Sequence, residues 1–203
     1  MLTTQFKPTI NKAFRPVAAF FVRLGISPFA ITIGCPLLMA VACWYFLQTR
    51  AVVPFCVAAL VIGLLDGLDG AVARLGGRTS AFGSYLDALC DRYVDGLVAF
   101  TAAAVTGYWL LCMLFLTGGY LVSYAKARAA MEVSVSNTEW PDLMERTERG
   151  LLFLAGLAAS ALIPVRPLGH DLFWWTLAVL SVLIHLTVVQ RVIRAARFIQ
   201  KRG

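Results

Sequence analysis

The chain has 203 residues, of which 60% are hydrophobic and only 14% are charged, and its net charge is +7. A soluble domain of this length would carry about 25% charged residues, so the composition argues against a soluble protein and favours an integral membrane protein. Because one membrane-spanning helix needs roughly 20 apolar residues, the length accommodates about six spans joined by short loops. We therefore expect a single all-α membrane domain over residues 1–203.

The N-terminal segment, residues 1–26, precedes the first long apolar run and is basic. It contains Lys7, Lys12, Arg15 and Arg23. A cleavable signal peptide would have a shorter apolar core closer to Met1, followed by a small-residue cleavage site, and this segment has neither feature. We expect an amphipathic helix lying on the membrane surface, with a linker to a six-helix bundle over residues 27–203.

Six apolar runs follow the N-terminal segment, and we predict that each forms a transmembrane helix. The predicted spans are residues 29–47, 51–73, 82–106, 108–128, 148–164 and 172–192. The breaks between them fall at residues 48–50, the pair Gly76-Gly77, Gly107, the polar stretch 132–149, and residues 164–171.

The lysines and arginines indicate how these spans are oriented. With the N-terminus in the cytoplasm, only Arg50 and Arg166 fall outside, Arg92 lies within a span, and all the others lie on the cytoplasmic side. An excess of basic residues on the cytoplasmic side follows the positive-inside rule, so we expect both termini in the cytoplasm. The same bias supplies most of the net charge of +7, and no nucleic-acid partner is needed to explain it.

Aspartates crowd into two of the predicted spans. Five of the 11 acidic residues lie between Asp66 and Asp95, in otherwise apolar surroundings. A charged side chain near the centre of a membrane helix costs roughly 2.5–3.5 kcal/mol, so five would cost on the order of 10 kcal/mol unless they had a partner. A bound cation is the obvious partner.

The spacing of the aspartates supports a cation site. Asp66 and Asp69 share one helix face at i, i+3, and Asp87 and Asp91 share a face of the next helix at i, i+4. A short loop joins the two helices, so both pairs are expected to converge at their cytoplasmic ends. Oxygen ligands without a nearby histidine favour Mg²⁺, Mn²⁺ or Ca²⁺ over zinc, iron or copper. Arg74, at the end of its helix, could bind a phosphate beside such metals.

A metal site is not the sole role that such carboxylates can have. They could pair with arginines between helices, and for Asp95 we leave this open. A cation or proton transporter also carries intramembrane acids, but these would lie nearer mid-membrane and on more helices. A catalytically silent scaffold would have no reason to retain such costly groups. Measuring turnover distinguishes such a scaffold from an enzyme.

The residues from Asp66 to Asp91 resemble the signature of the CDP-alcohol phosphotransferase family. The pattern is Asp66-x2-Asp69-Gly70-x2-Ala73-Arg74-x8-Gly83-x3-Asp87-x3-Asp91. The predicted six-helix topology and N-terminal interfacial helix also resemble the family. The resemblance implies an enzyme of phospholipid biosynthesis that transfers a phosphatidyl-type group from a CDP-linked lipid to an acceptor hydroxyl. It also implies a homodimer in a bacterial or archaeal plasma membrane, with its active site facing the cytoplasm.

The resemblance further implies roles for single residues. Asp66, Asp69, Asp87 and Asp91 would bind two Mg²⁺ ions, with Mn²⁺ as the alternative, and Asp91 would also take the acceptor's proton as the catalytic base. The CDP-lipid would be bound by Phe29, Thr32, Asp66, Gly70, Arg74 and Ser80. Phe29 departs from the family, which has Asn or Asp there, and this weakens its assignment.

Basic residues in the second half of the chain bear on the acceptor. They are Lys126, Arg128, Arg146, Arg149 and Arg191, all at predicted cytoplasmic helix ends. Such a cluster suits an acceptor that carries its own phosphate, although flanking charge under the positive-inside rule could also explain it. The motifs SYxKAR, ERxER and VQR resemble phosphatidylinositol phosphate synthases and their archaeal counterparts. Inositol phosphate is therefore the expected acceptor, and glycerol phosphate, as in phosphatidylglycerophosphate synthesis, is the alternative.

Overall fold

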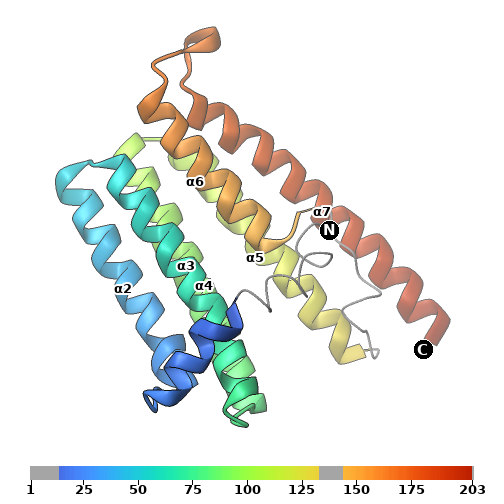
Figure 1. Cartoon of the computed structure of the whole chain (residues 1–203). Coiled ribbons are helices and arrows are strands. Elements are labelled where there is room, and N and C mark those ends of the chain that lie inside the picture. The colour runs from blue at the N-terminus through green and yellow to red at the C-terminus, as the bar shows by residue number, and fades with distance from the viewer. Residues whose placement is uncertain (1–13, 133–143, 203) are drawn as a thin grey trace. The chain divides into compact units, whose positions relative to one another are not determined.

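The computed structural model describes residues 14–132 and 144–202, which form α-helices and one short 3-10 helix, with no strand among them. The long helices are α2 (Pro28–Thr49), α3 (Val52–Leu75), α4 (Ala81–Thr106), α5 (Trp109–Glu132), α6 (Arg146–Leu162) and α7 (Leu172–Arg202) (Figure 1). The prediction of an all-α protein is confirmed for the described part of the chain. A further helical segment covers residues 14–23.

Four of these helices, α2, α3, α5 and α7, are long and apolar enough to cross a membrane. Helices α4 and α6 are not among these four, each for a separate reason. Helix α4 has 26 residues, but these include Asp87, Asp91, Arg92 and Asp95. Helix α6 has only 17 residues, which at a rise of 1.5 Å per residue is about 25 Å, less than the hydrocarbon core of roughly 30 Å.

The ends of α2 and α4 follow from local backbone chemistry. Arg50 ends α2 in the left-handed conformation with φ 55°, and Gly107 ends α4 with φ 80°, where glycine has no Cβ to clash. The Arg50 guanidinium donates hydrogen bonds to the Ala104 and Val105 carbonyls at 3.2 and 2.9 Å. Arg50 therefore satisfies last-turn carbonyls of α4 that have no partner within their own helix.

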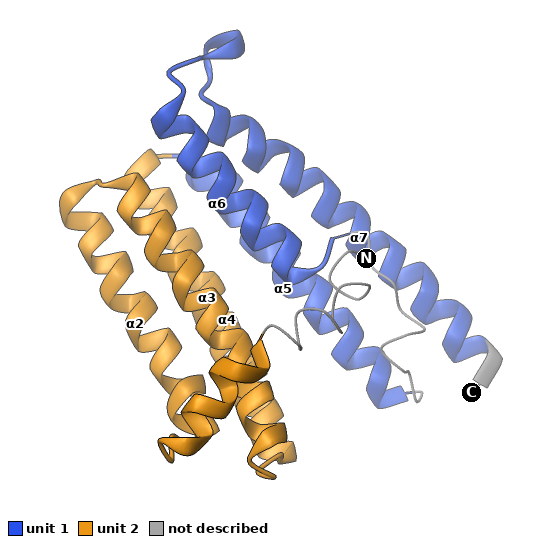
Figure 2. Ribbon diagram, viewed as in Figure 1, with its two compact units in different colours: residues 1, 108–203 blue, residues 2–107 orange. Residues whose placement is uncertain are grey.

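The chain divides into two compact units (Figure 2). In the N-terminal unit, which contains α2 to α4, α2 packs against both α3 and α4. Phe46 of α2 and Phe55 of α3 stack there with their ring centroids 4.4 Å apart. Because residues 76–80 join α3 to α4, the second half of α3 and the first half of α4 lie at the same end of this unit.

In the C-terminal unit, α7 packs against both α5 and α6. The core of this unit contains Phe153, whose ring centroid lies 5.0 Å from that of Phe115 and 5.1 Å from that of Phe173. Two glycines allow close helix contacts, Gly118 of α5 at Ile184 and Gly156 of α6 at Thr176. Small residues at such crossings are typical of helix packing in membranes.

The helical segment 14–23 lies along the second half of α3. A Cβ placed at Gly67 would be 3.3 Å from the Phe14 ring, and one at Gly76 would be 3.9 Å from Val22. Facing outward are Val17, Phe20 and Leu24, together with the exposed Arg15 and Arg23. The segment thus presents apolar and basic side chains to its surroundings.

Gly156→Ala is expected to destabilise the C-terminal unit by about 1–3 kcal/mol, because overpacking a tight core has that cost. The added Cβ would lie 2.6 Å from Thr176 Cβ, which cannot move without shifting α7. Thermal unfolding of the purified protein in detergent measures the effect. Gly150→Ala is the matched control in the same helix, since no atom lies within 4 Å of its added Cβ. An equal melting temperature for the two variants would contradict the prediction.

Candidate metal centre and active site

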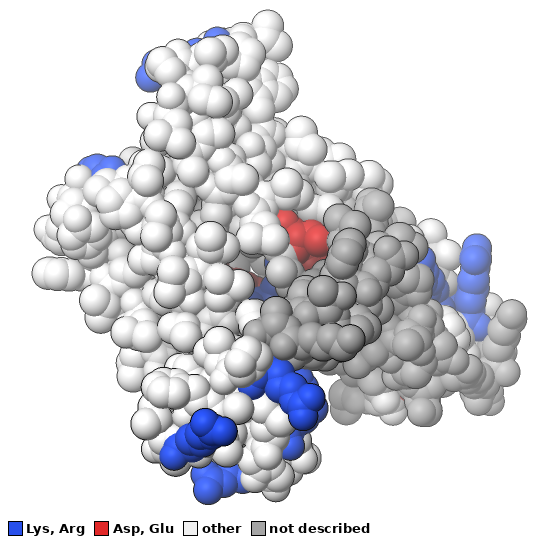
Figure 3. Space-filling view, viewed as in Figure 1, with Lys and Arg blue, Asp and Glu red and all other residues white. Residues whose placement is uncertain are grey.

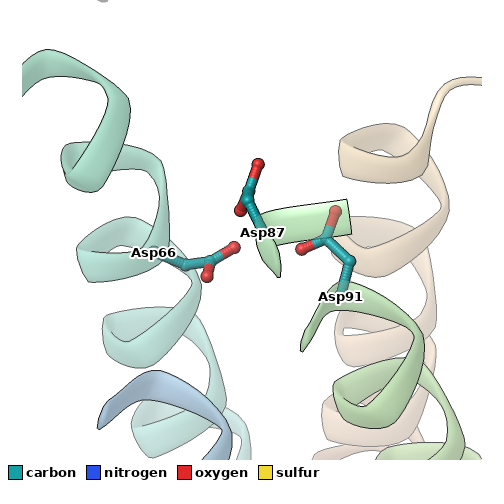
Figure 4. A group of neighbouring side chains, drawn as sticks. All are labelled: Asp66, Asp87 and Asp91. Atoms are coloured by element: carbon teal, nitrogen blue, oxygen red, sulfur yellow. The ribbon is translucent and has the colours of Figure 1, made fainter. Parts of the chain in front are cut away.

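Three carboxylates meet between α3 and α4. One oxygen from each of Asp66, Asp87 and Asp91 lies within 4.8 Å of the other two, and all three side chains are half-buried. Figure 4 shows Asp66 on α3 pointing toward Asp87 and Asp91 on α4. Oxygens bound to one Mg²⁺, Mn²⁺ or Ca²⁺ at 2.0–2.6 Å lie no more than about 5 Å apart. The arrangement therefore fits a single hard divalent cation.

The packing of the N-terminal unit explains how the three side chains meet. Asp87 and Asp91 project from one face of α4 because they are four residues apart. Helices α3 and α4 each pack closely against α2 and less closely against each other. This leaves room between α3 and α4 for side chains from both helices to meet. Two carboxylates at such a separation repel by about 3 kcal/mol at an effective dielectric constant of 20, and a cation would reverse that repulsion.

Asp69, the fourth predicted ligand, is positioned differently from these three. It is buried, with 9% of its surface exposed, and its Oδ2 accepts a hydrogen bond from Thr32 Oγ1 at 2.7 Å. The structure thus brings three of the four predicted carboxylates together and holds the fourth against α2.

Arg74 and Gly70 lie next to each other on α3. A Cβ at Gly70 would be 3.3 Å from Arg74 Nη1, so the absence of a side chain at Gly70 lets the guanidinium lie along the helix. Arg74 is exposed, as expected for a group that would receive a ligand's phosphate. Figure 3 shows Lys and Arg gathered at the lower end of the view. Arg23, Arg74 and Arg78, near the end of α3, are among the exposed arginines of the N-terminal unit.

Ser80, at the start of α4, and Phe29, at the start of α2, are further residues predicted to bind the CDP-lipid. Ser80 is its N-cap, and Ser80 Oγ accepts a hydrogen bond from the Gly83 N–H at 2.9 Å. The hydroxyl proton of Ser80 can still be donated to a ligand. The Phe29 ring lies 6.0 Å from that of Phe82 and is 37% exposed. Both residues therefore border the end of the unit that carries the arginines.

Sequence reasoning gave no role to Arg92. Its guanidinium lies 3.7 Å from Asp91 Oδ2 and 3.5 Å from Asp95 Oδ2. Asp95 thus forms an ion pair with a basic side chain of its own helix rather than of a neighbouring one. The spacing of Arg92 and Asp95, at i, i+3 on one helix, is the signal that could have predicted this pair.

In the C-terminal unit, two of the predicted acceptor-binding residues are buried. Arg149 of α6 and Arg191 of α7 are only 4% and 6% exposed. Arg191 donates a hydrogen bond to the Val122 carbonyl of α5, and a Cβ at Gly119 of α5 would lie 3.8 Å from Arg149 Nη2. Both guanidiniums therefore lie against the same turn of α5.

The remaining predicted acceptor-binding residues are more accessible. Lys126 and Arg146 are half-buried. Arg128 is half exposed and forms an ion pair with Glu132 at 2.6 Å. A glutamate thus already balances the charge of Arg128, which makes it the weakest anion-binding candidate of the set.

Comparison with known proteins agrees with this arrangement. Residues 26–197 match the family model for CDP-alcohol phosphatidyltransferases. The archaetidylinositol phosphate synthase of Aeropyrum pernix is 35% identical over 180 residues, covering 89% of this chain and 88% of that protein. The phosphatidylinositol phosphate synthase of Mycobacteroides abscessus is 32% identical over 195 residues, covering 91% of this chain and 84% of that protein.

Solved structures lead to the same family. The crystal structure of Mycobacterium tuberculosis phosphatidylinositol phosphate synthase with CDP-DAG bound has a TM-score of 0.78 at 25% identity, covering 91% of this chain and 94% of that chain. A second crystal structure of that enzyme contains manganese and citrate and also has a TM-score of 0.78. With four helices able to cross a membrane, the chain is an integral membrane protein. It belongs to the CDP-alcohol phosphatidyltransferase family of enzymes.

Proposed function

We propose that this chain transfers the phosphatidyl-type group of a CDP-linked lipid to a hydroxyl of a phosphorylated polyol, inositol phosphate, and releases CMP. The observation that carries the proposal is the half-buried group Asp66, Asp87 and Asp91, whose oxygens lie within reach of one cation. The names of the relatives, archaetidylinositol phosphate and phosphatidylinositol phosphate synthases, support inositol phosphate as the acceptor. Glycerol phosphate is the alternative.

The metal set of the proposal is two Mg²⁺ ions, held by Asp66, Asp69, Asp87 and Asp91. Manganese in the mycobacterial structure supports a divalent ion of this class, and Mn²⁺ remains the alternative. Bound metal would neutralise phosphate oxygens and polarise phosphorus. The chain's own residues would bind the rest of the donor: Arg74 as the partner of a phosphate, with Gly70, Ser80, Thr32 and Phe29 around it.

The reaction forms one phosphorus–oxygen bond and breaks another. The acceptor hydroxyl oxygen attacks the phosphorus that bears the lipid, and the bond from that phosphorus to CMP breaks, so CMP leaves with the electron pair. Asp91 takes the proton of the attacking hydroxyl, which general-base catalysis requires to lie within hydrogen-bond reach. No covalent enzyme intermediate is needed.

The acceptor's own phosphate would bind to the basic residues of the C-terminal unit. Arg149 and Arg191 are the strongest candidates, because a guanidinium can form bidentate, charge-assisted hydrogen bonds to a phosphate and a buried environment strengthens such bonds. Lys126 and Arg146 would add partly exposed charge, and Arg128 would contribute least. An uncharged acceptor would leave this cluster without a ligand.

In the membrane, we propose six spans that make up one functional domain, with both termini and the active site on the cytoplasmic side of a bacterial or archaeal plasma membrane. The exposed arginines Arg23, Arg74 and Arg78 at one end of the N-terminal unit support this orientation. The basic, apolar face of residues 14–23 suits a helix in the membrane interface. The lipid tails of the donor would lie in the bilayer, and the protein would form a homodimer.

The test is CMP release by purified protein supplied with CDP-diacylglycerol and Mg²⁺. We expect release with inositol phosphate at least about 10-fold faster than with free inositol, because a hydrogen bond to a charged phosphate contributes about 1.5–3 kcal/mol. Release with inositol phosphate should also exceed release with glycerol phosphate, since the relatives are inositol phosphate synthases. Chelation by EDTA should stop the reaction, and added Mg²⁺ or Mn²⁺ should restore it. Faster release with glycerol phosphate would identify glycerol phosphate, rather than inositol phosphate, as the acceptor. Release of CMP without metal would overturn the mechanism.

A further inference from the structure

The hydroxyl of Thr32 is directed at a carboxylate in another helix. Thr32 lies in the first turns of α2 and is only 4% exposed. Its Oγ1 lies 2.7 Å from Asp69 Oδ2 and 3.1 Å from the Pro28 carbonyl. A hydroxyl has one proton to donate, and the shorter contact with a charged acceptor is the stronger of the two. The proton therefore belongs to the hydrogen bond with Asp69.

This hydrogen bond restricts Asp69 in a way that suits a metal ligand. A carboxylate has two oxygens; Thr32 occupies Oδ2, which leaves Oδ1 available to a cation. Hydrogen bonds to a ligand from outside the coordination shell fix its orientation and typically change metal affinity by 10–100-fold. Because Asp69 is itself buried, solvent is a poor substitute for the Thr32 hydroxyl.

We propose that Thr32 is a positioning residue for the metal centre: its hydroxyl orients the Asp69 carboxylate and so sets the affinity of the ion that uses Asp69. The proposal rests on the metal-dependent function above. It gives Thr32 a role through Asp69, distinct from direct contact with the nucleotide. An ion held by Asp66, Asp87 and Asp91 alone depends less on Thr32, since this group is complete without Asp69.

Manganese binding without nucleotide tests the proposal, with free Mn²⁺ measured by electron paramagnetic resonance on full-length protein in detergent. Thr32→Val keeps the shape and removes the hydroxyl, and we expect one Mn²⁺ to bind about 10-fold more weakly while the other is unchanged. Thr32→Ser, which restores a hydroxyl, should bind within about threefold of the wild type. Should Thr32→Val fail to fold, Thr32→Ala provides the same comparison.

Thr187→Val is the matched control. Thr187 is fully buried, but its hydroxyl donates to the Leu183 carbonyl within its own helix at 2.8 Å. The substitution removes the same hydroxyl at a site where the acceptor is a backbone carbonyl instead of a carboxylate, so Mn²⁺ binding should not change. If Thr187→Val weakens Mn²⁺ binding as much as Thr32→Val does, the effect is general destabilisation and the proposal is overturned.

The double variant with Asp69→Asn separates a role through Asp69 from any other role. If Thr32 acts through Asp69, adding Thr32→Val to Asp69→Asn causes no further loss of Mn²⁺ affinity. Wild-type binding by Thr32→Val, or an undiminished loss in the Asp69→Asn background, overturns the inference alone. Absence of Mn²⁺ binding to the wild-type protein would instead overturn the proposed function.

Discussion

Asp91→Asn is expected to slow CMP release by roughly 10²–10⁴-fold, the contribution typical of a general base. Asparagine has nearly the shape of aspartate but cannot take a proton, and it removes a charge from the group that includes Asp66 and Asp87. Steady-state CMP release at saturating acceptor measures the loss. Binding of CDP-diacylglycerol, measured separately, should change little. Full activity of the variant would exclude Asp91 as the base.

Asp95→Asn is the matched control for Asp91→Asn. Asp95 lies one turn further along α4 and pairs with the same arginine, Arg92, at 3.5 Å. Losing this partly exposed ion pair should cost at most about 1 kcal/mol of stability and leave CMP release within a few-fold of wild type. If both variants lost activity equally, the effect would come from the charge balance of α4 rather than from proton transfer.

The convergence of Asp66, Asp87 and Asp91 was predictable because it depends on local rules. Helical spacing fixes which residues share a face, and the loop of residues 76–80 is too short to separate the ends of α3 and α4. The same locality explains why the helix breaks at Arg50 and Gly107 were predicted: both residues adopt positive φ, 55° and 80°, and end their helices.

The hydrogen bond from Thr32 to Asp69 was beyond sequence reasoning because it depends on the rotation of α2 about its axis. That rotation is set by packing against α3 and α4 together, and the apolar pattern of α2 gives little information about it. The burial of Arg149 and Arg191 is similar. The sequence identified both as basic residues at helix ends that could bind the acceptor's phosphate, whereas their burial against α5 depends on tertiary packing.

Helix length and span length also proved to be different quantities. Hydropathy predicted the end of the last span at residue 192, but α7 continues to Arg202. An apolar run reports the part of a helix that suits a bilayer, whereas backbone hydrogen bonding continues into polar sequence such as Arg194, Arg197 and Lys201. Hydropathy alone therefore cannot locate the end of such a helix.

Arg149→Gln and Arg191→Gln are each expected to raise the KM for inositol phosphate by at least about 10-fold. A hydrogen bond to a charged group contributes about 1.5–3 kcal/mol, and 1.4 kcal/mol corresponds to a factor of ten. Both guanidiniums are nearly fully buried, at 4% and 6% exposure, so water cannot easily replace them. The KM for CDP-diacylglycerol should stay within about twofold, since the donor would bind in the other unit.

Arg128→Gln is the control for these two variants. Its guanidinium is half exposed and already paired with Glu132 at 2.6 Å, and exposed pairs contribute about 0–1 kcal/mol, so the KM for inositol phosphate should rise by no more than about fivefold. Thermal unfolding separates binding from folding, because a buried arginine also supports its helix contacts. A parallel rise in both KM values with a lower melting temperature would mean that Arg149 and Arg191 are structural, and the phosphate of the acceptor would need another site.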